Sequence, residues 1–325
     1  MAKTRYAPDR GLTARMTLTM FLLGLVFVAF VTVLVLVLSA THAVGSGGIV
    51  FFAVLLALIL GVGSLFYSDK IALSAANAQL VTPQDGPQAA RLHGIVDRLC
   101  ALANMPKPRL AIAPSPMLNA FATGRNSKTA VLVATTGLLN NPDLTDQELE
   151  AVLAHELSHV AHKDVVVMTV ASFLGIIAGL LVRFAFYGEL FGGGGRSNNN
   201  NNNGGALPVI FIVMIVGIVT YAISFLLIRL LSRYRELAAD RSGALLTGQP
   251  SALASALQKV SGSMSRIPTK DLRSAEPLNA FYFVPAFKAG GKEASLSNIF
   301  STHPTLDRRL RQLAEISDQL NKTAG

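Results

Sequence analysis

Three side chains in one short stretch have the types and spacing to bind a metal ion and use it in hydrolysis. Residues 154–162 contain His155, Glu156 and His159 in an HExxH pattern. If the stretch is a helix, residues four apart share one face, so both imidazoles can bind one Zn²⁺ beside Glu156. The pattern therefore predicts a zinc hydrolase. The alternative is a pair of surface histidines on an amphipathic helix, which the structural context has to exclude.

A third ligand is required, because a catalytic zinc site usually has three protein ligands and one position open to water. His162 lies seven residues after His155, which is about 10 Å along a helix and too far for both to bind one ion. Glu236 is the better candidate, and Asp240 follows it by four residues on the same helix face. Glu236 could then bind zinc while Asp240 orients a ligand. Spacing alone leaves open a solvated Glu236 at a basic helix start.

The chemistry expected of such a site is hydrolysis of a peptide bond. Zinc lowers the pKa of a water molecule to about 7. Glu156 would accept the proton as the scissile carbonyl is attacked, and would then pass it to the leaving amine.

The composition is that of a membrane protein. Of the 325 residues, 51% are hydrophobic and only 14% are charged, with a mean hydropathy of +0.47. These values are too apolar for an ordinary soluble domain. The net charge of +9 lacks the aromatic-interleaved basic patches of a nucleic-acid binder, and we attribute it to membrane topology. The lone Cys100 excludes an intramolecular disulfide and a thiolate zinc cluster, and we expect it to be buried.

Four apolar runs are long enough to cross a bilayer, at residues 16–38, 48–67, 165–187 and 207–231. A cleaved signal peptide would have a shorter apolar core than the first run. Basic residues before the first run and after the fourth place both termini in the cytoplasm. Asp164 is expected to cap the third span. The Gly- and Asn-rich connector, residues 192–205, is expected to be disordered.

Soluble elements are predicted between and after these runs. A helix is expected over residues 87–103, and strands over 109–113, 119–123 and 129–135 with a turn at 124–126. Thr145 and Glu148 have capping-box spacing and announce the HExxH helix, whose buried face would hold Leu149, Val152, Leu153 and Leu157. After an irregular stretch with Pro268, Pro277 and Pro285, a final amphipathic helix is predicted over 304–320.

The predicted fold class is therefore α/β (α+β, mainly helical): a zincin-like domain with four transmembrane helices. Neither cytoplasmic segment is large enough alone to bury a good core, so the two should pack together. The predicted order is a cytoplasmic tail (1–15), transmembrane helices 1 and 2 (16–67), the first zincin segment (68–164), transmembrane helices 3 and 4 (165–231) and the second zincin segment (232–325).

The residues at 155–159 (His-Glu-Leu-Ser-His) followed by 235–240 (Arg-Glu-Leu-Ala-Ala-Asp) resemble the HtpX-type membrane zinc metalloproteases, relatives of the CAAX prenyl endopeptidases. The resemblance covers nearly the whole chain, because the order of spans and zinc-binding segments also matches. Two further patterns agree, at 119–124 and at His303-Pro304 leading to Arg309. Thr305 stands where a second proline is common, and the Gly- and Asn-rich insert is particular to this chain.

This resemblance implies one Zn²⁺ per chain on His155, His159 and Glu236, with Glu156 as general base. Further residues follow from it: Asn119 and His303 would help bind the transition state, and Asp240 and Arg309 would hold the ligands. It also implies a multi-pass protein of the bacterial inner membrane, with its active site in the cytoplasm. Its partners would be the lipid bilayer and protein or peptide substrates, above all misfolded or damaged membrane proteins, as in quality control.

Alternatives remain for several of these assignments. The strand at 119–123 could bind an extended peptide along its edge, or could be a core hairpin without substrate contact. His303 could simply cap the final helix. A metal transporter or channel would carry ionisable residues within its spans, and here only Arg183 and Arg229 occur, each near one end. An intramembrane protease is less consistent, because the HExxH precedes the third span.

Overall fold

The computed structural model describes residues 10–40, 46–126, 128–192, 206–264 and 303–324. The predicted tail up to residue 9, nearly all of the Gly- and Asn-rich connector and the stretch with the three prolines lie outside these residues. The chain divides into two compact units, each assembled from segments far apart in sequence. The first comprises Met1–Met16, Leu65–Val166 and Ser232–Gly325, and the second comprises Thr17–Ser64 and Val167–Leu231.

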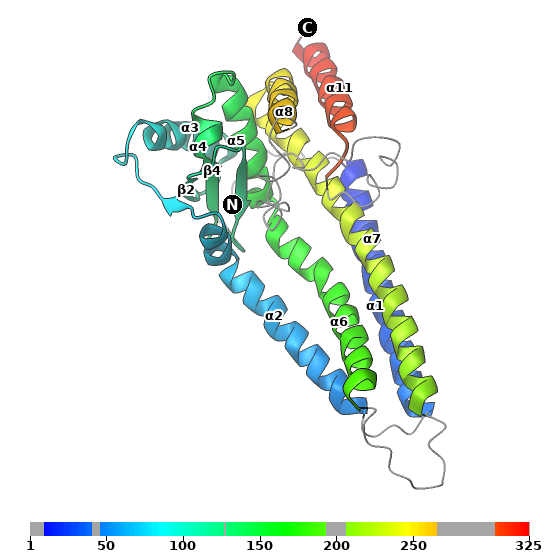
Figure 1. Cartoon of the computed structure of the whole chain (residues 1–325). Coiled ribbons are helices and arrows are strands. Elements are labelled where there is room, and N and C mark those ends of the chain that lie inside the picture. The colour runs from blue at the N-terminus through cyan, green and yellow to red at the C-terminus, as the bar shows by residue number, and fades with distance from the viewer. Residues whose placement is uncertain (1–9, 41–45, 127, 193–205, 265–302, 325) are drawn as a thin grey trace, which may run out of the picture. The chain divides into compact units, whose positions relative to one another are not determined.

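Helices dominate the described residues (Figure 1). The helices are α1 (Arg10–Ala40), α2 (Ser46–Ala75), α3 (Pro87–Ala103), α4 (Thr136–Leu139), α5 (Asp146–Ala161), α6 (Asp164–Gly192), α7 (Ala206–Thr247), α8 (Pro250–Met264) and α11 (Leu306–Ala324). The strands are β1 (Gln79–Leu80), β2 (Arg109–Ala113), β3 (Ala120–Thr123) and β4 (Val131–Thr135). The predicted helix over 87–103 and the strand over 109–113 are confirmed at the same bounds, and the final helix begins two residues later than predicted.

The first unit contains a small mixed sheet with the order β1-β2-β4-β3. Strand β2 runs parallel to β4, with Arg109 opposite Val131, and β3 runs antiparallel to β4, with Ala120 opposite Ala134. Every residue of β4 is buried, as expected for a central strand with a continuous apolar sequence. Strand β1 was not predicted. It pairs with β2 through two residues, which are too few to show an alternating pattern.

The turn between β3 and β4 depends on a glycine. Gly124 has φ 108°, a conformation that residues with a Cβ rarely adopt. A Cβ on Gly124 would also lie 2.7 Å from the Cα of Ala130. The turn predicted at 124–126 is therefore confirmed, and it returns the chain into the centre of the sheet.

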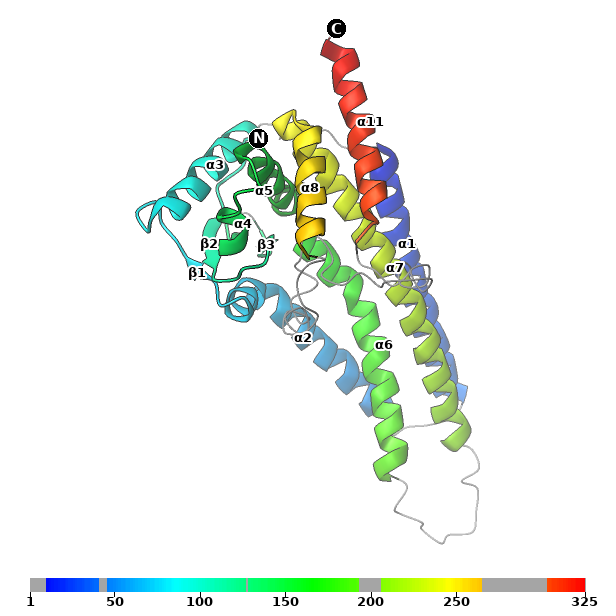
Figure 2. The same cartoon turned by 45° about the horizontal axis from the view of Figure 1, so that its top comes forward.

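Helix α5 is the central element of the first unit. It packs against β3 on the sheet, against α3 and against α8, and α11 in turn packs on α8 (Figure 2). The predicted buried face is confirmed, because Leu149, Val152, Leu153 and Leu157 are all at most 1% exposed. Leu257 of α8 and Leu313 of α11 belong to the same core, as does the buried Cys100. The C-terminal segment thus completes a core that the HExxH segment alone could not form.

The predicted capping box at the start of α5 is present. Thr145 Oγ1 accepts a hydrogen bond from the backbone N–H of Glu148, and the Glu148 carboxylate accepts one from the N–H of Thr145 at 2.8 Å. The carboxylate is almost fully buried and also binds α8, through Lys259 Nζ at 2.7 Å and Ser255 Oγ at 2.5 Å. Burial would raise the pKa of Glu148, but these hydrogen bonds outweigh it and lower the pKa to about 2. Glu148 therefore joins α5 to α8 as an ionised group.

We expect Glu148→Gln to destabilise the first unit by about 3 kcal/mol at pH 7, the value of a pKa lowered from about 4.5 to about 2. Because the folded-state pKa is the lower one, this stability is present above pH 4.5 and is lost as the pH falls towards 2. Thermal unfolding of the wild type and of Glu148→Gln in detergent should show a difference in stability that is at its full value at pH 7 and smaller at pH 3. A difference independent of pH would contradict the ionised pairing.

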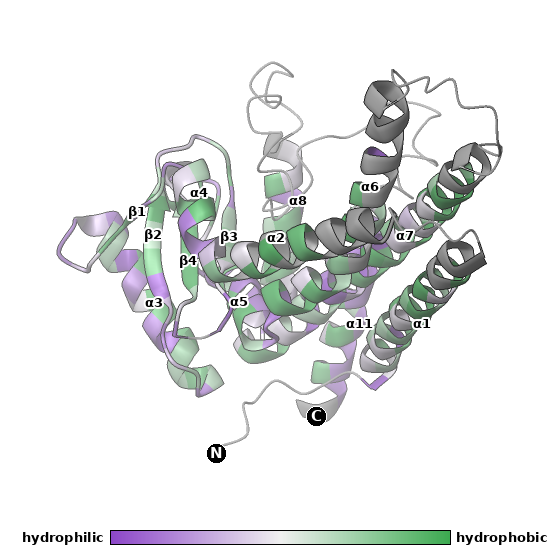
Figure 3. Ribbon diagram, turned by 90° about the horizontal axis from the view of Figure 1, so that it is seen from below, coloured by the Kyte–Doolittle hydropathy of each residue, from purple (hydrophilic) through white to green (hydrophobic). Residues whose placement is uncertain are grey.

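Two stretches, both lying mostly in the second unit, are long and apolar enough to cross a membrane: Arg10–Val33 of α1 and Phe211–Thr247 of α7. Hydrophobic residues predominate along both helices (Figure 3). Helix α6 meets the same criterion only when it is joined with α5 as one bent span. By length and composition the described residues therefore support two spans, or three with the bent pair, where four were predicted.

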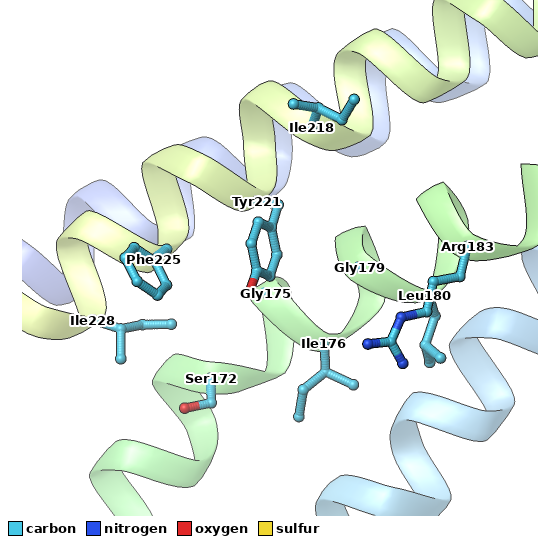
Figure 4. Close-up of a pocket in the computed structure, with 10 residues that line it drawn as sticks. All are labelled: Ser172, Gly175, Ile176, Gly179, Leu180, Arg183, Ile218, Tyr221, Phe225 and Ile228. Atoms are coloured by element: carbon cyan, nitrogen blue, oxygen red, sulfur yellow. The ribbon is translucent and has the colours of Figure 1, made fainter. Parts of the chain in front are cut away.

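The long helices of the second unit pack through small and apolar residues. Phe30 of α1 and Ile177 of α6 are buried in one cluster that also includes residues of α7. Gly175 and Gly179 of α6 face α7, where an added Cβ would lie 3.7 Å from Ile228 and from Tyr221 respectively. Between the two helices lies a cavity of about 640 Å³ (Figure 4). It is lined by Ser172, Gly175, Ile176, Gly179, Leu180, Arg183, Ile218, Tyr221, Phe225 and Ile228.

Candidate metal centre

Two helices of the first unit bring three potential metal ligands together. His155 and His159 lie one turn apart on α5, and their Nε2 atoms are 3.2 Å apart. Glu236 comes from α7, five residues after the predicted apolar run ends. Its Oε2 lies 3.7 Å from His155 Nε2, and its Oε1 lies 3.5 Å from His159 Nε2. All three donor atoms fall within 4.8 Å of one another.

These separations fit a single zinc ion. Ligand atoms at the usual 2.0–2.1 Å from a tetrahedral Zn²⁺ lie about 3.3 Å from each other. The distances of 3.2, 3.5 and 3.7 Å, the last two to different oxygens of the Glu236 carboxylate, are close to that value. The donor set of two imidazoles and one carboxylate is one that catalytic zinc sites use, and it leaves a fourth position for water. The three side chains can therefore hold a metal ion without rearrangement of the backbone.

Asp240 and Arg309 support the His155 side of this cluster. Asp240 Oδ1 lies 2.9 Å from His155 Nδ1, on the side of the ring opposite the cluster. Arg309 of α11 donates two hydrogen bonds to the Asp240 carboxylate, at 2.7 Å from Nε and 2.6 Å from Nη2. Asp240 is fully buried and Arg309 is 2% exposed, so each charge depends on the other. This chain of contacts fixes the ring orientation that directs His155 Nε2 at Glu236.

Two buried glutamates in the centre have opposite pKa shifts. Burial would raise the pKa of Glu236, but the charges and hydrogen bonds of His303 and His155 outweigh it and lower the pKa well below its usual value. Glu236 therefore stays ionised, as a metal ligand must. Burial also acts on Glu156, which is 4% exposed, and here it prevails over the opposing effect of the histidines and raises the pKa. Glu156 is thus the better proton acceptor of the two.

Asp164 has a position that the sequence analysis did not foresee. Helix α6 does begin at Asp164, but its carboxylate also contacts His159 Nδ1 at 2.5 Å and Arg235 Nη2 at 2.8 Å. Lys163, with φ 56°, turns the chain back between α5 and α6 and so returns Asp164 to His159. The sequence feature that could have indicated this contact is an aspartate just beyond the HExxH helix. Asp164 has the same relation to His159 as Asp240 has to His155.

We expect Asp164→Asn to weaken zinc binding by about 10–100-fold, the usual effect of removing a carboxylate that orients a ligating histidine. Competition with a zinc chelator measures this directly. Asp146→Asn is a matched control, because Asp146 lies in the first turn of α5, the helix that bears His159, is exposed and pairs with Arg91. Equal zinc affinity in Asp164→Asn and Asp146→Asn would contradict the orienting role.

A glycine sets the close approach of the two helices that carry the candidate ligands. A Cβ added to Gly243 of α7 would lie 2.9 Å from the backbone N of His155 and 3.1 Å from its Cα. The backbones of α5 and α7 therefore come into contact two turns beyond Glu236. His162, which spacing excluded as a ligand, is not in the three-residue cluster, and its Nε2 lies 3.4 Å from Ser242 Oγ.

The two remaining predicted site residues, His303 and Asn119, differ in their position relative to the metal-ligand cluster. His303 Nδ1 lies 3.2 Å from Glu236 Oε2, and the residue is 8% exposed, so His303 borders the cluster. Asn119 precedes β3 and is held by its backbone: its N–H donates to Thr135 Oγ1 and its C=O accepts from the Thr135 N–H. Strand β3 is an edge of the sheet and packs against α5.

A helix with an HExxH pattern and a buried glutamate, joined by a second glutamate from a later helix, is the arrangement of zinc-dependent metallopeptidases. The family profile described as Peptidase family M48 matches residues 87–317. Protease HtpX homolog 1 of Streptomyces coelicolor is 54% identical over 320 residues, which cover 98% of this chain and 97% of that protein. Protease HtpX homolog of Moorella thermoacetica is 47% identical over 315 residues, with 97% of each chain covered.

The chain therefore belongs to peptidase family M48 and is a metalloprotease, an enzyme that hydrolyses peptide bonds. The predicted resemblance is confirmed, and nothing in these matches supports a transporter or channel. A solved structure titled "Crystal Structure of S. mikatae Ste24p" matches with a TM-score of 0.48 and 18% identity. It covers 92% of this chain and 67% of that one, a likeness too distant to add to the assignment.

Proposed function

We propose that the protein is a zinc endopeptidase of the bacterial inner membrane that cleaves misfolded or damaged membrane proteins at the cytoplasmic surface. The observation that carries the proposal is the convergence of His155, His159 and Glu236 to within 4.8 Å, beside a buried Glu156. When bound, zinc supplies Lewis acidity, which polarises the scissile carbonyl and makes water acidic near pH 7. The relatives are named as proteases, which supports peptide-bond hydrolysis.

The chain's own residues have distinct roles in the proposed reaction. His155, His159 and Glu236 hold one Zn²⁺, while Asp240 with Arg309 fixes the orientation of His155. Glu156 accepts the proton of the attacking water and passes it to the leaving amine, a task suited to a carboxylate whose pKa burial raises. His303, at 3.2 Å from Glu236, is close enough to the centre to donate a hydrogen bond to the transition state. Asn119 contributes from the start of β3.

The proposed membrane topology has four spans, at 16–38, 48–67, 165–187 and 207–231. Helices α1, α2, α6 and α7 cover these four runs, and α1 and α7 satisfy the criterion for a span by themselves. The division into two compact units supports the proposed segmentation, because the unit boundaries follow the apolar runs. Arg10 and Arg15 before the first span and Arg233, Arg235 and Arg241 after the fourth support a cytoplasmic catalytic unit.

The proposed substrate contact is the edge of β3. An extended peptide can pair with a sheet edge through backbone hydrogen bonds and therefore needs little sequence in common with other substrates. Helix α5, which bears the HExxH, packs directly against β3, so a peptide on this edge would pass close to the metal ligands. This arrangement suits an enzyme that degrades many unfolded chains.

The function is tested by cleavage of casein with detergent-purified protein. We expect cleavage in the presence of zinc, its loss on treatment with a chelator, and its return when zinc is added back. Casein is unfolded, so it requires no specific recognition. A protein that binds zinc tightly and yet cleaves neither casein nor an unfolded membrane protein would refute the proposed endopeptidase activity.

A further inference from the structure

A second cavity, of about 480 Å³, lies in the first unit between the start of α1, α7 and α11. This volume lies in the range of about 300–1,000 Å³ found for small-molecule sites. The lining residues are Gly11, Leu12, Arg15, Leu237, Arg308, Arg311, Gln312 and Glu315. Three guanidinium groups against one carboxylate give this lining a net charge of +2 (3 − 1). The cavity is therefore suited to an anion.

The arginines come from different elements, and an anion between them would relieve the repulsion among their charges. Arg15 belongs to α1, whereas Arg308 and Arg311 lie three residues apart on one face of α11. A fourth arginine, Arg233 of α7, is half-buried and lies close enough to Arg308 to be affected by its charge. Phosphate oxygens match guanidinium groups in a bidentate manner and can accept from several arginines at once.

The cavity is placed where a lipid headgroup would lie. Arg15 directly precedes the apolar run that begins at residue 16, and α1 is one of the two helices that qualify as a span among the described residues. The first turns of such a helix lie at the level of the phosphates, and basic pockets beside spanning helices bind anionic headgroups. A free phosphate ion could make the same contacts with the arginines, but the position of the cavity at the bilayer surface favours a lipid headgroup.

The walls of the cavity adjoin residues of the metal centre. Leu237 follows Glu236 on α7, and Arg308 precedes Arg309 on α11. Gln312 Nε2 donates a hydrogen bond to the Leu237 carbonyl at 3.0 Å, so α11 is already held to α7 at this point. An anion bound by both Arg15 and the α11 arginines would add to this attachment. It would thereby keep Arg309 on Asp240, which orients His155.

We propose that this cavity binds the headgroup of an anionic phospholipid, and that the bound headgroup holds α11 in place and slows the loss of the metal ion. The proposal rests on the proposed membrane topology, since it requires the start of α1 to lie at the bilayer surface. It also implies that the protease is most stable in membranes rich in anionic lipid.

The test measures lipid binding by detergent-purified, zinc-loaded protein, without any assay of proteolysis. Short-chain dioctanoyl phosphatidylglycerol is compared with dioctanoyl phosphatidylcholine and with inorganic phosphate, by native mass spectrometry and by the shift in Tm. We expect phosphatidylglycerol to bind at least tenfold more tightly than either of the others. Equal binding of phosphatidylcholine would overturn the proposal, and so would equal binding of inorganic phosphate, which would assign the cavity to the free ion.

The double variant Arg308→Gln/Arg311→Gln should bind phosphatidylglycerol on the order of 10–100-fold more weakly, since charge-assisted hydrogen bonds are lost. Lys128→Gln/Lys322→Gln is the matched control, because it removes two charges from exposed positions outside the cavity. Unchanged lipid binding in the arginine variant would show that the headgroup does not bind in this cavity. The lipid comparison on the wild-type protein needs no variant, so misfolding of a variant cannot obscure the result.

The link to the metal centre has its own readout, the rate at which a chelator removes zinc. Phosphatidylglycerol should slow zinc loss several-fold in the wild type and the lysine control, but not in the arginine variant. Binding of phosphatidylglycerol with no change in the rate of zinc loss would refute the coupling. Failure of the proposed protease function would appear separately, as absence of casein cleavage with lipid binding intact.

Discussion

Replacing Glu156 by Gln is expected to abolish proteolysis while leaving the zinc content unchanged. An amide cannot accept the proton of the attacking water, and loss of a general base usually costs about 10²–10⁴-fold in rate. Glutamine has nearly the same shape as glutamate, so the buried position on α5 should accept it without disturbing His155 and His159. The measurements are kcat for casein or a quenched peptide, and zinc by elemental analysis of the same preparation.

Glu150→Gln is the matched control for this variant. Glu150 lies on the same helix, before Glu156, and its carboxylate pairs with Arg98 on α3. It should retain both zinc and activity. Cleavage by Glu156→Gln at the rate of the control would show that the base is another residue.

The second large effect is expected from Glu236→Gln, which should lose both zinc and activity. The neutral amide binds zinc weakly, and it also loses the ionised carboxylate that His303 and His155 stabilise. We expect zinc affinity to fall by more than about 100-fold, beyond the loss typical of residues that only orient a ligand. Zinc remaining after dialysis against a weak chelator measures this, with His159→Ala as a reference for a lost imidazole.

Tightly bound zinc at the wild-type level in Glu236→Gln would remove Glu236 from the ligand set and return attention to His162. Thermal unfolding separates this outcome from misfolding. Both ligand variants should unfold as the wild type does after its zinc has been removed, because the ion and not the side chain supplies the lost stability.

Much of the first unit could be predicted because its signals are local. Thr145 and Glu148 mark the start of α5, the apolar spacing of α3 is regular, and Gly124 marks a turn that only glycine tolerates. Strand β1 could not be predicted, since two residues carry no period. Nor could the attachment of Ser255 and Lys259 to Glu148, because a polar residue on a helix surface does not identify a partner more than 100 residues away.

In the candidate site, too, local features could be predicted from the sequence and long-range contacts could not. The HExxH helix indicates two ligands by spacing alone, whereas Glu236 required the resemblance to a family as well, since a glutamate in a basic helix has many uses. The sequence assigns Asp164 only to the N-terminal end of α6, because a helix cap is a sufficient reason for an aspartate at this position. Its contact with His159 depends on the backbone turn at Lys163, and the sequence gives no sign of that conformation.

The proposed ligand set is divided along the chain, with 81 residues from His155 to Glu236 (236 − 155). All of α6 and the apolar stretch of α7 are synthesised between them. A growing chain that carries the HExxH helix therefore cannot hold the ion with its full ligand set, and Arg309 follows later still. With this ligand set, the order of synthesis would delay a complete metal site until α6 and the apolar stretch of α7 have been made, and a shorter nascent chain would lack protease activity towards itself and its neighbours.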